Sequence, residues 1–353
     1  MKKLHVGLAG FGPGGHVFNA PIIGSTEGFI IAAAMTSNPQ NIKVAREKYP
    51  QASIVADYDQ LLKNEQLDLI VITTPNHTHY PMAKEALLAG KHVVVEKPFT
   101  VTTREAEDLI RLAKEKQVVL SINHNRRWDS DFQTVRQIIA SKRLGKIVEF
   151  QAHFDRFRNY IKPGWKEQED VPGSGILYDL GSHLIDQALL LFGLPSEVFA
   201  LLSSQRADSK VTDNFEVFLI YPDLKVRLSA GMLVKHPGPR YTVLGRNGSF
   251  LKFGMDPQEA ALKEGQYPRD MSFWGVEDSQ IWGELHLDSD GKTSIEKIRS
   301  EPGDYRKFYQ NIYQAIVNKA PLEVTPEQAR RVIQIIEASY RSHQTKRMVA
   351  VNE

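Results

Sequence analysis

The first 122 residues alternate short apolar segments with helical ones, and this alternation constrains the fold more than any other feature. Buried strands are predicted at Leu4–Ala9, Phe29–Met35, Leu67–Thr73, His92–Glu96 and Val118–Ile122. Nearly continuous apolar runs are typical of a parallel sheet covered by helices on both faces. Repeated β and α units of this kind indicate a doubly wound parallel sheet.

Helix-boundary signals lie between these strands. Asn38 and Pro39 place a cap residue before a proline at a helix start. A helical pattern over residues 78–89 is followed by Gly90, a residue suited to the position after a helix end. Thr102 and Glu105 have the spacing of a capping box ahead of a helix that ends near residue 116.

The pattern changes after about residue 123. One more helix is predicted over Ser130–Ser141, followed by alternating strands at Lys146–Phe157, Glu197–Gln205, Asn214–Tyr221, Lys225–Leu233 and Tyr241–Gly245, with a hairpin turn at Asn247-Gly248. A final helix is predicted to begin at Pro326 and end near residue 342. Residues 255–300 show no clear pattern.

We therefore predict an α/β protein of two domains. Residues 1–122 form a doubly wound domain, and residues 123–353 form a C-terminal α/β domain with a large, mainly antiparallel open sheet. The last helix, about 326–342, is a candidate to pack back on the first domain.

Composition excludes several classes of protein. The 353 residues carry a formal net charge of +2, which gives no electrostatic case for a nucleic-acid partner. The absence of cysteine excludes disulfides, Cys-zinc sites, iron–sulfur clusters and a thiol nucleophile, and it fits a cytoplasmic protein. No apolar run approaches the roughly 18 residues of a membrane span, so no membrane partner is expected.

A glycine-rich turn follows the first strand. Gly10, Phe11, Gly12, Pro13, Gly14 and Gly15 form a G-x-G-x-x-G sequence between a predicted strand and a helix. In this context the first glycine permits a tight turn, the second lets the backbone approach a pyrophosphate, and the third lets helix and strand pack closely. The sequence predicts a dinucleotide site there; the alternative is a glycine-rich turn without a ligand.

The end of the second strand bears on the choice of cofactor. Sites for NAD commonly have an acidic residue about 20 residues after the turn. Here the strand is followed by Thr36, Ser37 and Asn38, whose hydroxyl and amide groups accept a 2′-phosphate without charge repulsion. We predict NADP in preference to NAD. The alternative is that these groups only cap the following helix.

A lysine ends the fourth apolar strand. Glu96, Lys97 and Pro98 lie at the carboxyl edge of the sheet, where open α/β sheets bind ligands. A partly buried lysine beside a cationic nicotinamide has a lowered pKa and is a usable acid or base. The alternative is a lysine that pairs with Glu96 or is solvated.

A second polar group stands out at Asp179, His183 and Asp186. The four-residue and three-residue spacings place these side chains on one face if the segment is α-helical. Three interpretations remain open at this point: a structural salt link, a metal site, and an acid/base pair at a substrate hydroxyl.

Together these motifs resemble the Gfo/Idh/MocA oxidoreductases. The resemblance rests on the Gly10–Gly15 fingerprint, on Thr74, Pro75 and Asn76 followed by His79, on AGKHVVVEKP, and on G-x-x-x-D-x-G-x-H ending at His183. It covers essentially the whole chain. NHNRRWDSDF, YDLGSHLIDQALLLFGLP and RYTVLGRNGSFLKFGMDPQE are further similar to the branch that contains NADP-dependent scyllo-inositol dehydrogenases.

The resemblance implies a Rossmann domain, a C-terminal α/β domain, and a homodimer or homotetramer formed through the C-terminal sheet. It implies that Lys97 is the catalytic lysine, that Asp179 binds the substrate hydroxyl, and that His183 transfers the proton. Asn76 and His79 would lie near the cofactor, with Thr74 and Pro75 in the same motif, and no metal is implied. The segment Pro172–Gly175 matches the family glycines only in part.

Candidate substrate-binding residues lie in the second domain. They combine hydrogen-bonding groups with aromatic rings, which suits a polyhydroxyl ring: Asn125, Arg127, Asp155, Arg158, Trp165 and Tyr241. Alternate residues on a strand share a face, so Asp155 and Arg158 belong to different faces if the strand continues through both. An ordinary half-exposed strand is the alternative for each of them.

The predicted function is an NADP(H)-dependent oxidoreductase. It would transfer hydride between nicotinamide C4 and a carbinol or ketone carbon of a cyclic polyol or sugar, with scyllo-inositol and its inosose as the preferred pair. Two alternatives are a non-enzymatic NADP(H)-binding sensor, since the fold binds a cofactor with or without chemistry, and a redox-assisted glycosidase of the same family.

Overall fold

The computed structural model describes residues 2–289 and 291–351. The chain forms two compact units. Unit 1 contains the residues up to Asn125 together with Gln258–Trp274 and Asp304–Arg330. Unit 2 contains Arg126–Pro257, Gly275–Gly303 and the residues from Arg331 onward. The chain thus crosses between the units several times, where the sequence had suggested one boundary near residue 122.

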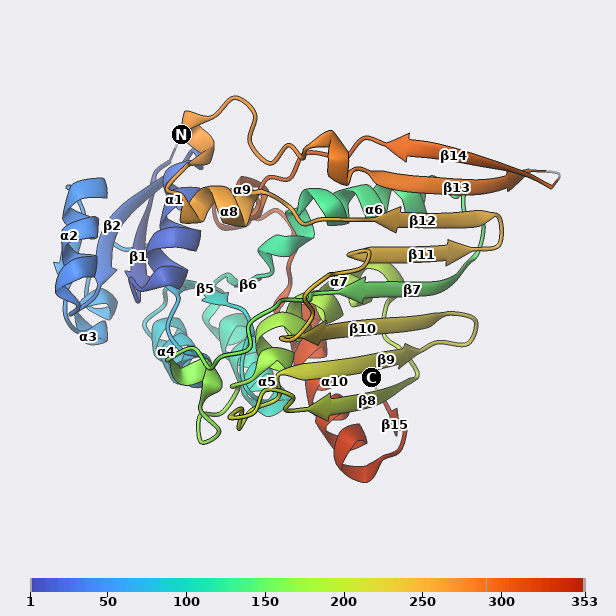
Figure 1. Cartoon of the computed structure of the whole chain (residues 1–353). Helices are drawn as coiled ribbons and strands as arrows, with labels where there is room; N and C mark the ends of the chain where they lie inside the picture. Colours follow the sequence, from blue (N-terminus) through green and yellow to red (C-terminus); the bar gives the residue numbers. More distant parts are fainter. Residues whose placement is uncertain (1, 290, 352–353) are drawn as a thin grey trace. The chain divides into compact units, whose positions relative to one another are not determined.

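Unit 1 is built on a six-stranded parallel sheet (Figure 1). Its strands are β1 Leu4–Ala9, β2 Phe29–Met35, β3 Ser53–Val55, β4 Leu69–Ile72, β5 His92–Glu96 and β6 Leu120–Asn123, in the order β3-β2-β1-β4-β5-β6. This is the doubly wound order, whose direction reverses between β1 and β4. The five predicted strands are confirmed, and β3 was missed because three partly exposed residues give no periodic pattern.

Helices of unit 1 follow the strands. They are the π-helical turn η1 Gly14–Asn19, α1 Ala20–Gly24, α2 Pro39–Lys48, α3 Tyr58–Leu62, α4 Asn76–Leu88, α5 Thr103–Lys116, α8 Gln258–Lys263, the 3₁₀ turn η5 Pro268–Asp270 and α9 Arg306–Asn318. The predicted capping box at Thr102 and Glu105 is present. The helix α10, Pro326–Thr345, begins in unit 1 and ends in unit 2.

Two late segments complete the core of unit 1. The buried amide oxygen of Gln258 accepts hydrogen bonds from Trp274 Nε1 at 2.7 Å and from the backbone nitrogen of Tyr305 at 2.8 Å. Ser121 on β6 donates to the carbonyl of Val324 at 2.8 Å. These contacts explain how residues that gave no sequence pattern belong to the nucleotide-binding-type fold.

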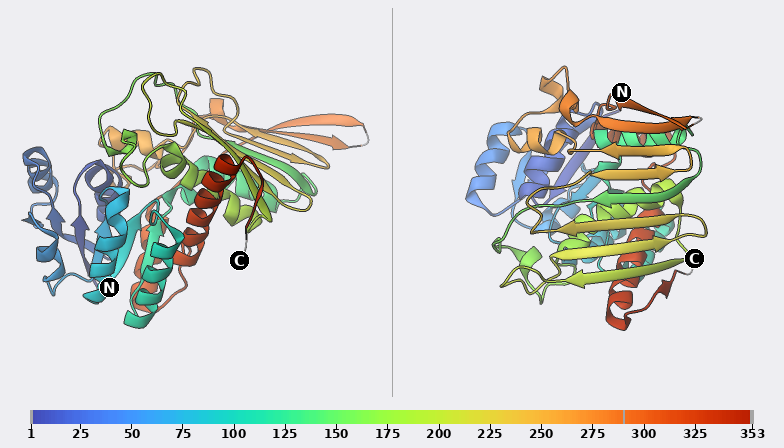
Figure 2. Two further views of the ribbon diagram at one scale, coloured as in Figure 1. Left: turned by 90° about the horizontal axis from the view of Figure 1, so that it is seen from below. Right: turned by 45° about the vertical axis from the view of Figure 1, so that its right-hand side comes forward.

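Unit 2 is built on a nine-stranded sheet (Figure 2). Its strands are β7 Ile147–His153, β8 Glu197–Ser203, β9 Asn214–Ile220, β10 Lys225–Gly231, β11 Tyr241–Gly245, β12 Gly248–Lys252, β13 Gly283–Ser289, β14 Lys292–Ile298 and β15 Val349–Ala350. Neighbouring strands pair antiparallel except β7 and β10, which are parallel. The predicted large open sheet is confirmed as a mixed, mostly antiparallel one.

Helices cover one face of this sheet, as the side view of unit 2 shows (Figure 2). They are η2 Asn125–Trp128 in part, α6 Ser130–Ala140, η4 Leu177–Gly181, α7 Ser182–Phe192 and the later part of α10, with short 3₁₀ turns η3 Trp165–Glu167 and η6 Ser279–Ile281 nearby in the chain. Side chains alternate between the helix-covered face, where Phe150, Phe215 and Phe250 have no exposed surface, and the opposite, open face. The hairpin β13–β14 escaped prediction because most of β14 is exposed on both faces.

Within the described ranges, every helix is too short or too polar to cross a lipid bilayer.

Candidate functional site

The glycine turn has the backbone geometry that the fingerprint predicts. Gly10 has φ +101°, a conformation that side chains rarely allow. A Cβ on Gly15 would lie 2.4 Å from the carbonyl oxygen of Gly10, so only glycine permits this packing. Thr73, at the end of β4, donates its hydroxyl to the same carbonyl at 2.7 Å and fixes the turn.

The turn also leaves room for a ligand. A Cβ on Gly12 would meet no atom within 4 Å, so this backbone faces open space. The N-terminal end of η1 follows directly, and its free N–H groups favour an anion. The residues therefore fit the diphosphate of a dinucleotide.

At the end of β2 the three polar residues are partly used within the protein. Asn38 caps α2 by accepting from the backbone nitrogens of Gln40 at 2.9 Å and Asn41 at 3.2 Å. The Thr36 hydroxyl accepts from the nitrogen of Asn38 at 3.3 Å. The capping interpretation of Asn38 is thus correct, and Ser37 stays exposed beside it.

The Thr74–Asn76 motif lies after β4, where α4 begins. Asn76 is buried there, and the Thr74 hydroxyl accepts a hydrogen bond from Thr78 at 2.7 Å. The ring nitrogens of His79 lie 2.8 Å from the carbonyl of Pro98 and 2.9 Å from that of Thr74. Burial lowers the pKa of His79 to about 4, so the neutral ring donates from one nitrogen at a time. His79 therefore ties the Thr74 turn to the segment after Lys97.

Glu96 and Lys97 lie at the carboxyl end of β5 and are both partly exposed. The Glu96 carboxylate accepts from the side chains of Asn19 at 2.7 Å and Asn123 at 2.8 Å, and from the Lys97 backbone at 3.1 Å. Sequence reasoning missed Asn19 and Asn123. Asn123 is the first residue of the NHNRRWDSDF motif but had been given no role, whereas no local pattern marks Asn19.

In unit 2, Asp179 lies in a π-helical segment. A π-helical turn contains more residues than an α-helical one, so the prediction that Asp179 and His183 share the face of one continuous α-helix is corrected here. The Asp179 carboxylate forms an ion pair with Lys166 at 2.6 Å. The side chain of Asp179 retains 21% exposure, so one face remains open.

His183 lies in the first turn of α7 and is 6% exposed. Its ring lies 6.4 Å from that of Phe154, centroid to centroid. Three guanidinium groups lie over the same Phe154 ring. Their distances to the ring centroid are 4.9 Å for Arg126, 5.2 Å for Arg156 and 4.3 Å for Arg240. Two of these arginines are balanced by buried aspartates, Arg126 by Asp129 at 3.0 Å and Arg240 by Asp131 at 3.7 Å.

Two predicted substrate residues have internal partners. Arg127 forms a buried, bidentate ion pair with Asp186, at 2.8 Å from Nε and 2.6 Å from Nη2. Tyr241 has no exposed surface, and its hydroxyl donates to Gln187 at 2.9 Å. These contacts anchor α7, which carries His183, and they account for both side chains without a ligand. They also show that Asp186 serves as a salt link.

The other predicted substrate residues differ in their partners and exposure. Asp155, 11% exposed, accepts from the nitrogen of Gly231 at 3.2 Å. Arg158 forms an ion pair with Glu167 at 2.6 Å, and Trp165 is partly exposed in η3. Asn125 belongs to unit 1, where η2 begins.

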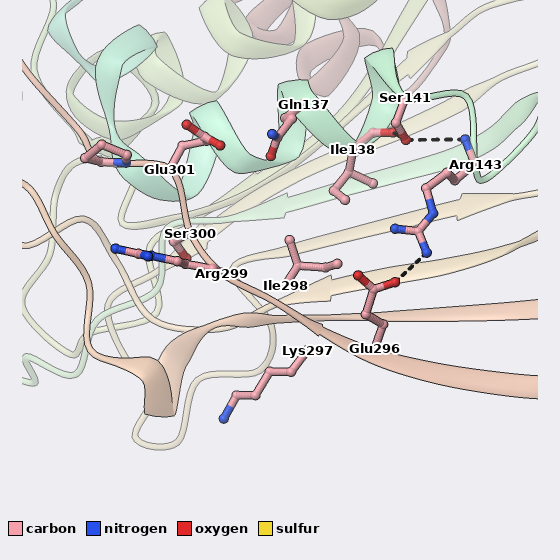
Figure 3. Close-up of a pocket in the computed structure, with 11 residues that line it drawn as sticks. Gln137, Ile138, Ser141, Arg143, Glu296, Lys297, Ile298, Arg299, Ser300 and Glu301 are labelled. Carbon is pink, nitrogen blue, oxygen red and sulfur yellow. Dashed lines mark hydrogen bonds and ion pairs between the residues drawn. The ribbon is translucent and has the colours of Figure 1, made fainter.

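One pocket of about 580 Å³ lies in unit 2 between α6 and the segment from β14 to Pro302 (Figure 3). It shares no residue with the candidate site. At its rim the guanidinium of Arg143 pairs with the carboxylate of Glu296 at 2.5 Å. In the described part of the chain, no group of three or more His, Cys, Asp or Glu residues is arranged to hold a metal ion.

Two profiles of one protein family match the chain. Residues 4–124 match the profile described as an oxidoreductase family, NAD-binding Rossmann fold. Residues 136–351 match the C-terminal alpha/beta domain of that oxidoreductase family.

Curated relatives match over nearly the whole chain. One is the scyllo-inositol 2-dehydrogenase (NADP(+)) IolW of Bacillus subtilis, 38% identical over 349 residues, or 99% of this chain and 96% of that protein. The oxidoreductase YdgJ of Escherichia coli is 40% identical over 96% of each chain. A D-glucoside 3-dehydrogenase of Escherichia coli is 28% identical over 55% of this chain and 56% of its own.

Solved structures share the fold. The yvaA protein of Bacillus subtilis superposes with a TM-score of 0.95 at 37% identity, covering 99% of each chain. The YPO2259 protein of Yersinia pestis superposes with a TM-score of 0.94 at 40% identity, covering 100% of this chain and 98% of its own.

Proposed function

The chain belongs to the Gfo/Idh/MocA family of oxidoreductases, and we propose that it is an NADP(H)-dependent dehydrogenase that interconverts scyllo-inositol and its inosose. The observation that carries this proposal is the 38% identity, over 99% of the chain, to an NADP-dependent scyllo-inositol 2-dehydrogenase. We place it in the cytoplasm, where NADP(H) is available.

The cofactor assignment is supported by the end of β2. A carboxylate at this point would repel the 2′-phosphate of NADP and would bind the free ribose hydroxyl of NAD. Thr36, Ser37 and Asn38 carry no charge, and the exposed Ser37 hydroxyl is a suitable donor to a phosphate.

The mechanism assigns proton transfer to this chain's own side chains. A dinucleotide held at the Gly10–Gly15 turn would supply the acceptor for the hydride of the carbinol carbon. The hydroxyl must also lose a proton, and we assign acid/base roles in this step to Lys97 and to His183. Asp179 accepts a hydrogen bond from the hydroxyl and orients it. Ketone reduction uses the same groups in reverse.

We also propose that two or four copies associate through the open face of the unit 2 sheet. Supporting this, Leu201 on β8 is 44% exposed and Ile295 on β14 is 66% exposed, and both belong to the face without helices. Exposed apolar residues on a broad surface favour association with a protein partner.

The test is a matched absorbance assay at the NADPH wavelength. NADP⁺ and NAD⁺ are each paired with inositols, inososes, hexoses and glycosides, in both directions. We expect the highest kcat/KM with NADP(H) and the scyllo-inositol pair. Turnover of another polyol only would overturn the substrate assignment. Tight NADPH binding without any turnover would favour the sensor, and hydrolysis of glycosides without net NADPH change would favour the glycosidase.

A further inference from the structure

A network of hydrogen bonds beside the glycine turn involves groups that the proposed mechanism does not use. The side-chain nitrogen of Asn19 donates to the carbonyl of Gly14 at 2.9 Å and to Glu96 Oε1 at 2.7 Å. The side-chain oxygen of Asn19 accepts from Asn123 at 3.1 Å and from the hydroxyl of Tyr309 at 2.5 Å. Asn123 also donates to Glu96 Oε1 at 2.8 Å. All of these residues belong to unit 1.

The amide of Asn19 has one favourable orientation. Its two N–H groups meet two acceptors and its oxygen meets two donors, which is the full capacity of the group. A flipped amide would place its oxygen against the Glu96 carboxylate and the Gly14 carbonyl. Because Asn19 has no exposed surface, water does not relieve that repulsion.

Tyr309 helps to fix this orientation. It lies on α9 with 1% exposure, and its hydroxyl is 290 residues from Asn19 in the chain. Burial raises its pKa well above the usual value, so the hydroxyl keeps its proton and remains a donor.

The position of Glu96 depends on the same amide. Its Oε1 is held by Asn19 and Asn123, which turns Oε2 toward the backbone nitrogen of Lys97 at 3.1 Å. Both carboxylate oxygens of Glu96 therefore have donors, which hold the side chain in one orientation beside the lysine. One amide therefore joins the turn that faces the diphosphate to the residue that precedes Lys97.

We propose that Asn19 and Tyr309 are positioning residues that couple the glycine turn to the Glu96–Lys97 segment, so that cofactor binding and turnover both depend on them. The proposal rests on the proposed function, because it takes Lys97 as the acid/base group. It adds two residues that contact neither reacting atom.

The chain offers a matched pair of tyrosines for the test. Tyr309 and Tyr313 are both buried on α9, and both pack edge-to-face against Phe29, at 5.9 and 5.8 Å between ring centroids. The Tyr313 hydroxyl donates instead to the carbonyl of Lys2 at 2.8 Å. Replacement of either by phenylalanine removes one buried hydroxyl from the same helix, but only Tyr309→Phe disturbs Asn19.

We expect Tyr309→Phe to raise the Kd for NADPH roughly two- to tenfold and to lower kcat by a similar factor, the range for one lost hydrogen bond. KM for the polyol at saturating NADPH stays within about twofold, and Tyr313→Phe changes none of these values. Kd is measured by NADPH fluorescence. Equal effects of the two variants on Kd and kcat overturn the proposal, while turnover by the parent protein preserves the proposed function.

Asn19→Asp provides a second readout. An ionised side chain there faces Glu96 Oε1 and the Gly14 carbonyl, and it regains a donor when protonated. Its defect in NADPH binding is therefore large at pH 8.5 and shrinks toward pH 6, whereas Tyr309→Phe shows a constant defect. A pH-independent defect in Asn19→Asp contradicts the coupling. Because this titration needs no polyol, it tests the positioning role even if the substrate assignment fails.

Discussion

The carboxylate of Glu96 accepts hydrogen bonds from two asparagines and from the backbone of Lys97. At the residue scale, side chains from distant parts of the chain thus hold Glu96, the residue before the candidate catalytic Lys97, in one orientation. In unit 2, a bidentate ion pair with Arg127 holds Asp186 one turn beyond His183. Breaking such a buried pair from one side leaves an uncompensated charge.

Lys97→Ala and His183→Ala should each lower kcat by roughly 10²–10⁴-fold, the usual contribution of a positioned acid or base. The Kd for NADPH should change little, particularly in His183→Ala, because the proposal assigns the histidine to the polyol and not to the cofactor. Steady-state kinetics and fluorescence titration measure the two effects. Lys63→Ala, which removes an exposed lysine on α3's end, is the control. Near-normal turnover in both catalytic variants would sink the assignment.

Ser37→Asp should reverse the cofactor preference. A carboxylate beside a 2′-phosphate creates a like-charge contact worth several kcal/mol, so kcat/KM with NADP⁺ should fall at least about tenfold relative to NAD⁺. Ser37→Asn has a similar size without the charge and should keep the preference for NADP⁺. If Ser37→Asp retains the parent's ratio, the 2′-phosphate is bound elsewhere.

At the scale of the elements, the helices that carry candidate groups start in an unusual way. The glycine turn leads into the π-helical η1, and Asp179 lies in the π-helical η4 directly before α7. Such turns leave some carbonyls for side chains, as Asn19 shows with Gly14. Strand β5 is tied at its start as well, because His92 Nδ1 accepts from the backbone nitrogen of Val119, at the entrance to β6, at 2.9 Å.

His92 should make the protein less stable as the pH falls. Burial, and then the charge of Lys319, lower its pKa from 6.5 to about 4. Above pH 6.5 folded and unfolded chains are both neutral at this ring; below it the unfolded chain binds the proton more readily, so stability decreases down to pH 4. Between these two pH values the free energy of unfolding decreases by an amount on the order of 3 kcal/mol.

The measurement is the denaturant midpoint between pH 8 and pH 4.5. His92→Asn keeps an acceptor near Nδ1 but does not titrate, so its pH dependence should be shallower than that of the parent. The pKa of His79 is also lowered, so the His92→Asn variant should still lose some stability as the pH falls. His5→Asn, at a partly exposed position, is the control. A slope in His92→Asn equal to the parent's would refute the linkage.

At the scale of the whole molecule, unit 2 presents a nine-stranded sheet with helices on one face only. An antiparallel sheet can face water on one side. The open face of this sheet carries charged pairs such as Arg227 with Glu216 and Lys225 with Glu149. Exposed apolar side chains lie among them.

Leu201→Lys combined with Ile295→Lys should weaken association through this face. We expect the parent to be a dimer or tetramer by light scattering at micromolar concentration and the double variant to shift toward smaller species, because a buried lysine without a partner is unfavourable. Leu88→Lys, at an exposed apolar residue of α4 in unit 1, is the control. A monomeric parent would refute the proposal.

Much of unit 1 was predictable because its signals are local. The runs Leu4–Ala9 and Phe29–Met35 are buried on both faces, and the Gly10–Gly15 turn is fixed by steric limits on single residues. The capping box at Thr102 likewise depends on neighbours three residues apart. The β13–β14 hairpin and the return of residues 258–274 to unit 1 left no such signal.

The sequence alone was enough to predict the longer strands of unit 1, the glycine turn and the absence of an acid at the end of β2. These depend on backbone sterics, apolar periodicity and residue chemistry within short windows. The tertiary structure alone decided that Arg127 pairs with Asp186, that Tyr241 lies in the core, and that Tyr309 reaches Asn19. Those partners meet only when the chain is folded, because a buried polar group bonds to whichever group the packing brings to it.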